Sequence, residues 1–213
     1  MIGQDGLYGL YPALVTDIVD PDRLGRVEVS LPHLGSEDAA VRHWATLLTP
    51  YADDNEGFCS YPSVGSQVVV GFEAGDANRA YVLGSCWNGV ESPPTPATRQ
   101  NDLKVWRTRS GSVLEFNDAS GRVRISLTTD SGHELVLDAG GSEIRLQHAN
   151  GFGITLSASG GVDIVGNAPV TISAPELTVH APVAKFDGLV KCSAVITESV
   201  TSPLYTPGAG NMW

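Results

Sequence analysis

The residues best suited to chemistry are three carboxylates close together in the sequence, Asp53, Asp54 and Glu56. Carboxylates gathered by a fold can bind divalent cations or act as general acid and base. These three share their stretch with an Asn and a Gly, which is typical of a solvated loop. Ser110 and Ser131 lack the sequence context of an activated nucleophile. The sequence therefore predicts no catalytic residue and no enzyme.

The histidines do not show the spacing of a metal site. They are His33, His43, His133, His148 and His180. We predict no metal and no cofactor, and we interpret His33 as a packing or hydrogen-bonding residue. His148 and His180 each lie one place beyond an apolar-x-apolar pattern. The sequence therefore leaves an alternative open: if three copies of the chain assemble, His148 and His180 could face their threefold axis and bind an ion between the chains.

The three cysteines, Cys59, Cys86 and Cys192, have no close metal-type spacing, and an odd number makes a poor disulfide framework. We predict buried free thiols in a reducing compartment. No apolar run approaches the length of a membrane span, and the N-terminus lacks the basic and apolar regions of a signal peptide. We therefore expect synthesis in the cytosol.

The charge of the chain argues against nucleic acid as a partner. Lys and Arg number 13 against 24 Asp and Glu, a formal net charge of −11, and such a chain repels phosphate backbones. Lys104, Arg107 and Arg109 come nearest to a basic patch, and we interpret them as solvated positions on a strand. Several aromatic residues could stack bases: Trp44, Tyr61, Phe72, Tyr81 and Trp87. Structural docking fits the charge better, and an adhesin or carbohydrate-binding fibre is the alternative.

The first 89 residues have the pattern of a small all-β domain. Alternating or continuous apolar runs predict strands over 14–19, 26–31, 42–48, 66–72 and 81–87. An Asp-, Pro- and Gly-rich turn over 20–25 joins the first two strands into a hairpin. About five strands without a helix predict a Greek-key barrel of the oligonucleotide/oligosaccharide-binding (OB) type. A proline-stiffened linker follows over 90–102.

Between Leu114 and Phe186 the chain repeats one small pattern, in which two apolar residues flank a polar or small one and a turn follows. The pairs are Leu114/Phe116, Ile125/Leu127, Leu135/Leu137, Ile144/Leu146, Ile154/Leu156, Val162/Ile164, Val170/Ile172, Leu177/Val179 and Ala184/Phe186. Alternation at period two marks strands with one buried face, and its recurrence marks a stacked β-repeat.

One chain cannot close a core from this repeat, because each strand offers about two inward apolar side chains and no helix is available to cover them. Copies of the chain must supply the missing walls, and cyclic symmetry would also remove exposed strand edges. We therefore predict a trimeric, intertwined triple-stranded β-helix needle over 103–200. The pairs from Leu114 to Val179 would form its core, and residues 201–213 would form an apex.

Four segments carry a resemblance to a known family: 25–35 (GRVEVSLPHLG), 44–45 (WA), 61–76 (YPSVGSQVVVGFEAGD) and 81–89 (YVLGSCWNG). With 111–116 and 205–211, they resemble the baseplate assembly protein V family of contractile phage tails and the VgrG-type spikes of type VI secretion. The resemblance spans nearly the whole chain. It implies a non-enzymatic central spike whose barrel meets the baseplate hub and inner tube proteins. Three chains would wind into a needle that acts on the target membrane only mechanically.

The chain departs from that family at two places. Residues 90–102 leave no room for the lysozyme domain that some members carry, and no His-x-His pair is present to bind iron at the apex. The resemblance therefore implies a separate PAAR-type tip protein, docked on Tyr205, Met212 and Trp213. It also implies assembly in the bacterial cytoplasm as part of a phage tail or phage-tail-like particle.

Overall fold

The computed structural model describes residues 6–36 and 39–202 of the chain. Within them the regular structure is β-strand, apart from one 3₁₀ turn at Glu73–Gly75. The all-β prediction is therefore confirmed. The chain divides into two units, Met1–Asn167 and Ala168–Trp213. The first unit holds a closed barrel and a separate seven-stranded sheet.

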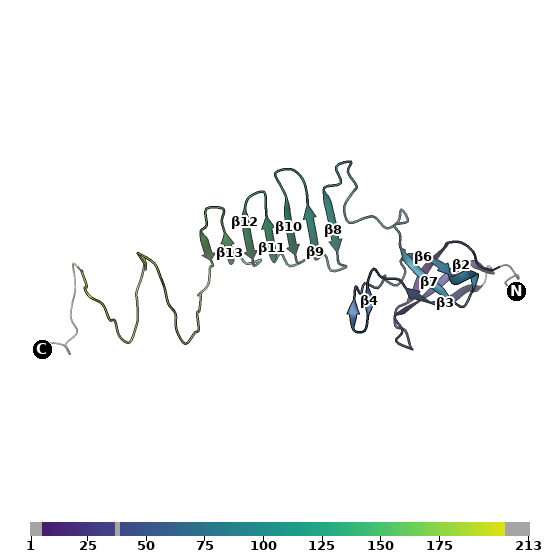
Figure 1. Ribbon diagram of the computed structural model, residues 1–213, viewed down its shortest axis with the longest axis horizontal. Helices are drawn as coiled ribbons and strands as arrows, with labels where there is room; N and C mark the ends of the chain where they lie inside the picture. Colours follow the sequence, from purple (N-terminus) through teal and green to yellow (C-terminus); the bar gives the residue numbers. More distant parts are fainter. Residues whose placement is uncertain (1–5, 37–38, 203–213) are drawn as a thin grey trace. The chain divides into compact units, whose positions relative to one another are not determined.

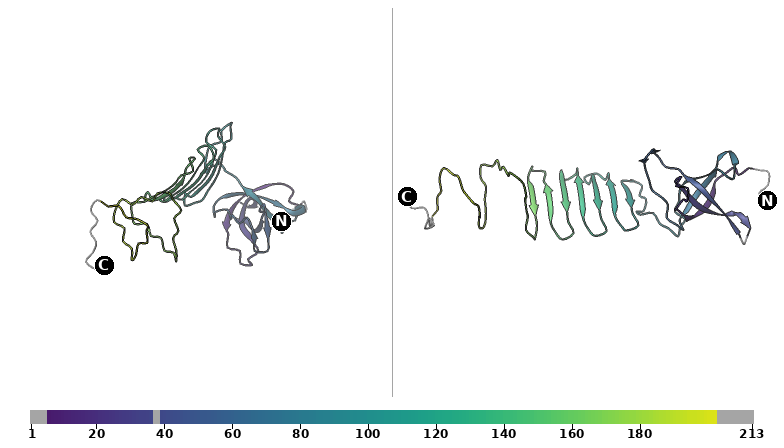
Figure 2. Two further views of the ribbon diagram at one scale, coloured as in Figure 1. Left: turned by 60° about the vertical axis from the view of Figure 1, so that its left-hand side comes forward. Right: turned by 90° about the horizontal axis from the view of Figure 1, so that it is seen from below.

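The barrel has five strands that close in the order β1-β2-β3-β7-β6 (Figures 1 and 2). Their bounds are β1 Tyr11–Asp17, β2 Arg26–Ser36, β3 Ala39–Leu47, β6 Gln67–Phe72 and β7 Ala80–Ser85. The β3–β7 pair is parallel, and the other neighbours are antiparallel. This closed five-stranded arrangement confirms the OB-type prediction. The predicted first strand, 14–19, in fact begins and ends earlier.

The barrel core consists of alternate residues on every strand. On β2, Val27, Val29 and Leu31 are almost completely buried, and on β6 Val68 and Val70 are fully buried. The remaining buried members of the cluster are Ala13, Val15, Ala45, Ala80 and Val82. Period-two burial of β-branched residues is what a strand with one inward face requires. The core lies wholly between residues 13 and 82, so it is complete without the rest of the chain.

A short hairpin, β4 (Ala52–Asp53) and β5 (Glu56–Gly57), interrupts the stretch that we predicted as a loop. Asn55 turns the chain with a φ of 56°, a value that Asn tolerates better than most residues. Each of these strands has only two residues, which is too few to show an alternating pattern of apolar and polar residues in the sequence. The stretch from Cys86 to Asp102, which contains the proline-rich segment, forms no strand.

The seven-stranded sheet is an antiparallel meander in which each strand pairs with the next along the chain (Figures 1 and 2). Its strands are β8 Leu103–Arg107, β9 Val113–Asn117, β10 Arg124–Thr128, β11 Glu134–Asp138, β12 Glu143–Gln147, β13 Gly153–Leu156 and β14 Val162–Val165. The cross-strand pairing runs from β8 to β14 without a register shift. Every side chain's face is therefore fixed by its position.

Four of the connections in this sheet share one five-residue turn. The N–H of the first residue donates to the carbonyl of the fifth, at 2.7 to 2.9 Å, and the fourth residue is a glycine whose N–H donates to the carbonyl of the first. These glycines have φ between 82° and 96°, a region that favours glycine. The turns are 108–112, 129–133, 148–152 and 157–161.

The strands predicted beyond Val165 are not present in the single chain. Residues 166–202 contain no strand, although Val170/Ile172, Leu177/Val179 and Ala184/Phe186 continue the apolar pattern. The pattern by itself cannot form a strand, because a strand also needs a hydrogen-bonding neighbour. Prolines recur between the pairs and remove donors from any such ladder.

The cysteines depart from prediction as well. Cys59 and Cys192 are exposed and Cys86 is half-buried, so the prediction of buried thiols was wrong. Cys59 follows the small β4–β5 hairpin outside the barrel core, and Cys192 lies in the strand-free stretch, where no second layer covers it.

Candidate functional site

The apolar face of the seven-stranded sheet is formed by two columns of cross-strand neighbours. One column consists of Phe116, Ile125, Leu137, Ile144, Leu156 and Val162, and the other of Leu114, Leu127, Leu135, Leu146, Ile154 and Ile164. These twelve residues are the first six predicted pairs. The register places all of them on one face, as the period-two pattern predicted.

The apolar face is uncovered in the single chain. Leu114 and Ile154 are half-buried, and the other side chains of the two columns are exposed by between 37% at Leu135 and 63% at Val162. A monomeric soluble protein rarely exposes a contiguous apolar patch that extends over so many strands. Two columns of Leu, Ile, Val and Phe therefore indicate a surface that is buried against other protein.

The opposite face is closed by its own side chains. Val136 is 1% exposed and Ser126 is 8% exposed. Charged residues lie around them, and an Arg124 guanidinium nitrogen lies 3.2 Å from a Glu115 carboxylate oxygen. Arg145 lies 3.3 Å from Glu143 in the same way. This face thus carries two arginine–glutamate pairs formed within the chain, whereas the apolar face has no cover there.

The remaining predicted core and tip residues do not join this sheet. Val170, Ile172, Leu177 and Val179 lie in the strand-free stretch and are 58% to 68% exposed. Tyr205, Met212 and Trp213 fall outside the described residues.

The candidate catalytic carboxylates do not converge. Asp53 and Asp54 are exposed at the tip of the β4–β5 hairpin, where an Asp53 oxygen accepts the Asp54 N–H at 2.8 Å. Glu56 instead accepts the hydroxyl of Tyr51, which raises the pKa of that tyrosine. No group of three or more metal-ligating side chains is gathered within residues 6–36 and 39–202. The hydroxyls of Ser110 and Ser131 face threonines of their own turns.

The candidate stacking aromatics do not form one platform. The Arg26 guanidinium lies 5.9 Å from the ring centre of Trp44, and Phe72 packs edge-on against Tyr11 with ring centres 5.4 Å apart. The Tyr81 hydroxyl donates to Glu73 at 2.9 Å, which raises the pKa of Tyr81. Tyr61 and Trp87 remain exposed. The five residues are thus engaged in separate local contacts or lie apart.

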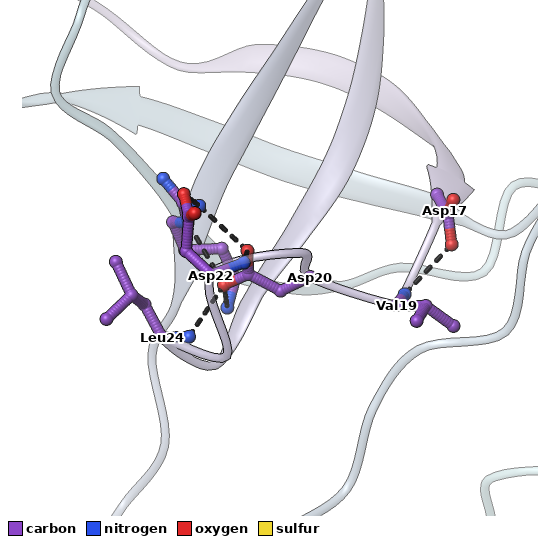
Figure 3. Close-up of polar contacts among 6 residues, drawn as sticks. Asp17, Val19, Asp20, Asp22 and Leu24 are labelled. Carbon is purple, nitrogen blue, oxygen red and sulfur yellow. Dashed lines mark hydrogen bonds and ion pairs between the residues drawn. The ribbon is translucent and has the colours of Figure 1, made fainter.

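The turn between β1 and β2 contains a polar network that the sequence reading missed (Figure 3). The side chain of Asp20 is 5% exposed. Its carboxylate accepts the backbone N–H groups of Asp22 at 3.1 Å and Leu24 at 2.8 Å. Arg26 adds two side-chain hydrogen bonds, at 2.7 and 3.1 Å, and a longer one from its backbone N–H. A buried carboxylate with this many donors fixes the hairpin that opens the barrel.

The same network perturbs the ionisation of both partners. The Arg26 side chain, and then the backbone N–H donors, hold the pKa of Asp20 well below its usual range, although burial opposes them. Asp20, and then Asp22, raise the pKa of Arg26. Each shift follows from hydrogen bonds that favour the charged form. The sequence signal was an aspartate before a proline-containing turn, with arginine six places later.

Among the described residues, no helix is long and apolar enough to cross a bilayer.

The described part of the chain thus holds a closed OB barrel and a meander sheet with one uncovered apolar face. Residues 11–87 match the family model of the Type VI secretion system/phage-baseplate injector OB domain. The barrel is therefore an injector OB domain, as found in proteins of the baseplate V and VgrG type, and the resemblance drawn from the sequence is confirmed.

Curated relatives carry the same similarity. The chain is 26% identical over 115 residues to the actin cross-linking toxin VgrG1 of Vibrio cholerae, covering 50% of this chain and 10% of that protein. It is 28% identical over 103 residues to the type VI secretion system spike protein VgrG1a of Pseudomonas aeruginosa, covering 46% and 16%. It is 23% identical over 130 residues to VgrG3 of Vibrio cholerae, covering 58% and 13%. The matched regions span less than a fifth of each of these relatives.

Proposed function

We propose that this chain is the central spike of a contractile injection apparatus, either a type VI secretion system or a phage tail or phage-tail-like particle. One observation carries the proposal. An injector OB domain precedes a β-sheet whose apolar face has no cover in the single chain. The spike proteins among the relatives support the same role.

The active form in this proposal is a homotrimer. Three copies would turn their apolar faces toward one axis, so that each column of side chains packs against those of the other two chains. This removes apolar surface from water, at roughly 25 cal/mol per Å². Cyclic symmetry with three chains also leaves no sheet edge free to recruit further copies. The proline-interrupted stretch from 166 to 202 would then find its strand partners in other chains.

In this proposal each successive segment of the chain has its own role. The barrel within residues 1–89 would dock on the baseplate hub and inner tube proteins, with 90–102 as linker. Residues 103–200 would form the needle, and 201–213 would carry the PAAR-type tip protein. The spike would cap the tube and cross the target envelope by stiffness alone, without catalysis. It would assemble in the bacterial cytoplasm as part of the particle.

The mass of the purified full-length chain in solution tests the proposal. Size-exclusion chromatography with light scattering should give three times the 22.4 kDa chain mass, and electron microscopy should show a rod. A monodisperse monomer at micromolar concentration would refute the spike. If the trimer forms, immunogold labelling should place it at the end of the particle, and labelling along the tail shaft would refute the placement.

A further inference from the structure

Two histidines that are distant in sequence lie side by side on the seven-stranded sheet. The ring centres of His133 and His148 are 4.2 Å apart. Leu135 pairs with Leu146 across β11 and β12, and the histidines occupy the next same-face position beyond that pair. They therefore lie at the border of the apolar face.

Both imidazoles hold the turn 148–152 through a ring nitrogen that accepts a hydrogen bond. His148 Nδ1 accepts the N–H of Asn150 at 3.2 Å. His133 Nδ1 accepts the N–H of Ala149 at 3.3 Å. A neutral ring that accepts at Nδ1 carries its proton on Nε2. Nε2 of each ring is therefore an N–H donor, whereas a metal ion would need a ring lone pair.

The other three five-residue turns carry a hydroxyl at their first position instead of an imidazole, and each of these hydroxyls donates to the carbonyl of the fifth residue at 3.3 to 3.4 Å. Their first residues are Thr108, Thr129 and Ser157, and each lies about 3 Å from a serine hydroxyl two places later, at distances of 3.1, 3.0 and 2.9 Å. His148 occupies the equivalent first position of its turn. A hydroxyl keeps its hydrogen-bonding capacity throughout the physiological pH range, whereas an imidazole can accept a hydrogen bond only while it is neutral.

We propose that the turn 148–152 is a pH-sensitive element of the sheet, closed when both imidazoles are neutral and released when they are protonated. A protonated imidazole donates from both nitrogens, so each Nδ1 would lose its backbone partner. Two positive charges would also face each other across the 4.2 Å separation. Imidazole is the side-chain type whose charge changes between about pH 5 and 8, so pH 8 and pH 5 are the two conditions to compare.

The surroundings offer no built-in counter-charge. Thr129 is the hydrogen-bonded neighbour of His133 on one side of the pair, and Phe152 is the neighbour of His148 on the other side. The charged residues of the adjoining segments are Arg109, Asp130 and Glu134. A Cβ on Gly111 would lie 2.7 Å from an Asp130 oxygen, which places that carboxylate against the neighbouring turn. Glu134 pairs with Gln147 on the opposite face, and none of the ion pairs of the described residues involves His133 or His148.

This inference goes beyond the proposed spike and does not depend on it, because both histidines and the turn belong to one chain. In a covered sheet it would have a further effect, since protonation would place charge beside Leu135 and Leu146. Acidification would then loosen the sheet at this point.

Hydrogen exchange of the full-length chain at pH 8 and pH 5, corrected for intrinsic rates, tests the proposal. The amides of 149–152 should lose about fivefold or more of their protection at pH 5. The hydroxyl-based turns 108–112 and 157–161 serve as internal controls and should not change. His148→Thr supplies the hydroxyl of the sister turns and should reduce the pH effect, whereas His180→Ala, at an exposed site, should retain it.

Three results would overturn the proposal. Equal protection of 149–152 at both pH values would be the first. An unchanged pH effect in His148→Thr would be the second. The third would come from NMR spectra of ¹⁵N-histidine-labelled protein at pH 8. A proton on Nδ1 of both rings would exclude Nδ1 as the hydrogen-bond acceptor.

Discussion

Ile144→Asp is the sharpest test of the proposal that other copies of the chain cover the apolar face. Ile144 lies in the middle of its column, with Leu137 on one side and Leu156 on the other. It is 43% exposed in the single chain, so the substitution places a carboxylate in an apolar row without any cation opposite it. Thr155→Asp is the matched control, because Thr155 lies on the opposite face between Arg145 and Asp163, so the new carboxylate has a cation on one side.

The expected cost follows from the environment that three copies would create. A buried charge left without a partner costs about 3–5 kcal/mol, and the lost isoleucine burial adds about 1 kcal/mol for the part still exposed in one chain. Three copies therefore lose roughly 12 kcal/mol or more per trimer. At 1.4 kcal/mol per tenfold, the association constant falls by about eight orders of magnitude or more. The control substitution Thr155→Asp should cost less than about 1 kcal/mol, as surface pairs do.

Light scattering of the two full-length variants at equal concentration separates the outcomes. Ile144→Asp should lose the mass of three 22.4 kDa chains and appear as monomer or as heterogeneous aggregate, while Thr155→Asp should keep it. A stable Ile144→Asp trimer with the same resistance to heat and detergent as Thr155→Asp would show that this face is not the interface.

Three further outcomes are expected. Asp20→Asn should reduce the hydrogen-exchange protection of the Leu24 amide. In the unchanged protein the pKa of Asp20 is lowered, so the stabilisation by its carboxylate is full above about pH 4 and is lost as the pH falls below that value. Equal protection of the Leu24 amide at pH 3 and pH 6 would contradict the network. Residues 1–89 alone should give a soluble β-rich fragment with cooperative thermal unfolding, and an unfolded fragment would contradict a self-sufficient barrel. Gly132→Ala should cost about 1–2 kcal/mol of stability per chain, because φ is 87° at this glycine, and it should lower the thermal midpoint of the full-length protein. Gly84→Ala is the control and should leave the thermal midpoint unchanged, because a Cβ at that position would meet open space.

The barrel and the face of each sheet strand could be predicted because both depend on one short-range signal. Alternation of apolar residues fixes which side chains share a face, and the observed register places all six pairs from Leu114/Phe116 to Val162/Ile164 accordingly. Strand ends were less predictable. The start of β1 at Tyr11 lies in a segment that does not alternate clearly, and only pairing with β6 brings it into the barrel.

The polar details depend on contacts that no local pattern encodes. In the sequence Asp20 looks like an ordinary turn residue. Its burial depends on the side chain of Arg26, which lies on the next strand of the hairpin and donates hydrogen bonds to it. His133 and His148 are fifteen positions apart and meet because β11 and β12 are paired in that register. No local pattern reveals that four connections of the sheet share one hydrogen-bonding scheme.

The change of structure after Val165 has a physical origin in the length of the repeat. In the sheet, a strand of four or five residues and a connection of four to six fill each repeat, so a chain can fold back on itself and pair. Between Val170, Leu177 and Ala184 the spacing falls to seven, which leaves two or three residues to reverse the chain after a strand of the same length. The sequence there offers Ala-Pro in place of the glycine turns used by the sheet, and proline fixes φ near −65° and lacks an N–H. Reversal is therefore disfavoured while the apolar pattern persists. A chain that keeps the pattern of a strand but loses the means to reverse can satisfy its backbone by lying beside other copies of itself, which is also the arrangement that we propose for the uncovered face of the sheet.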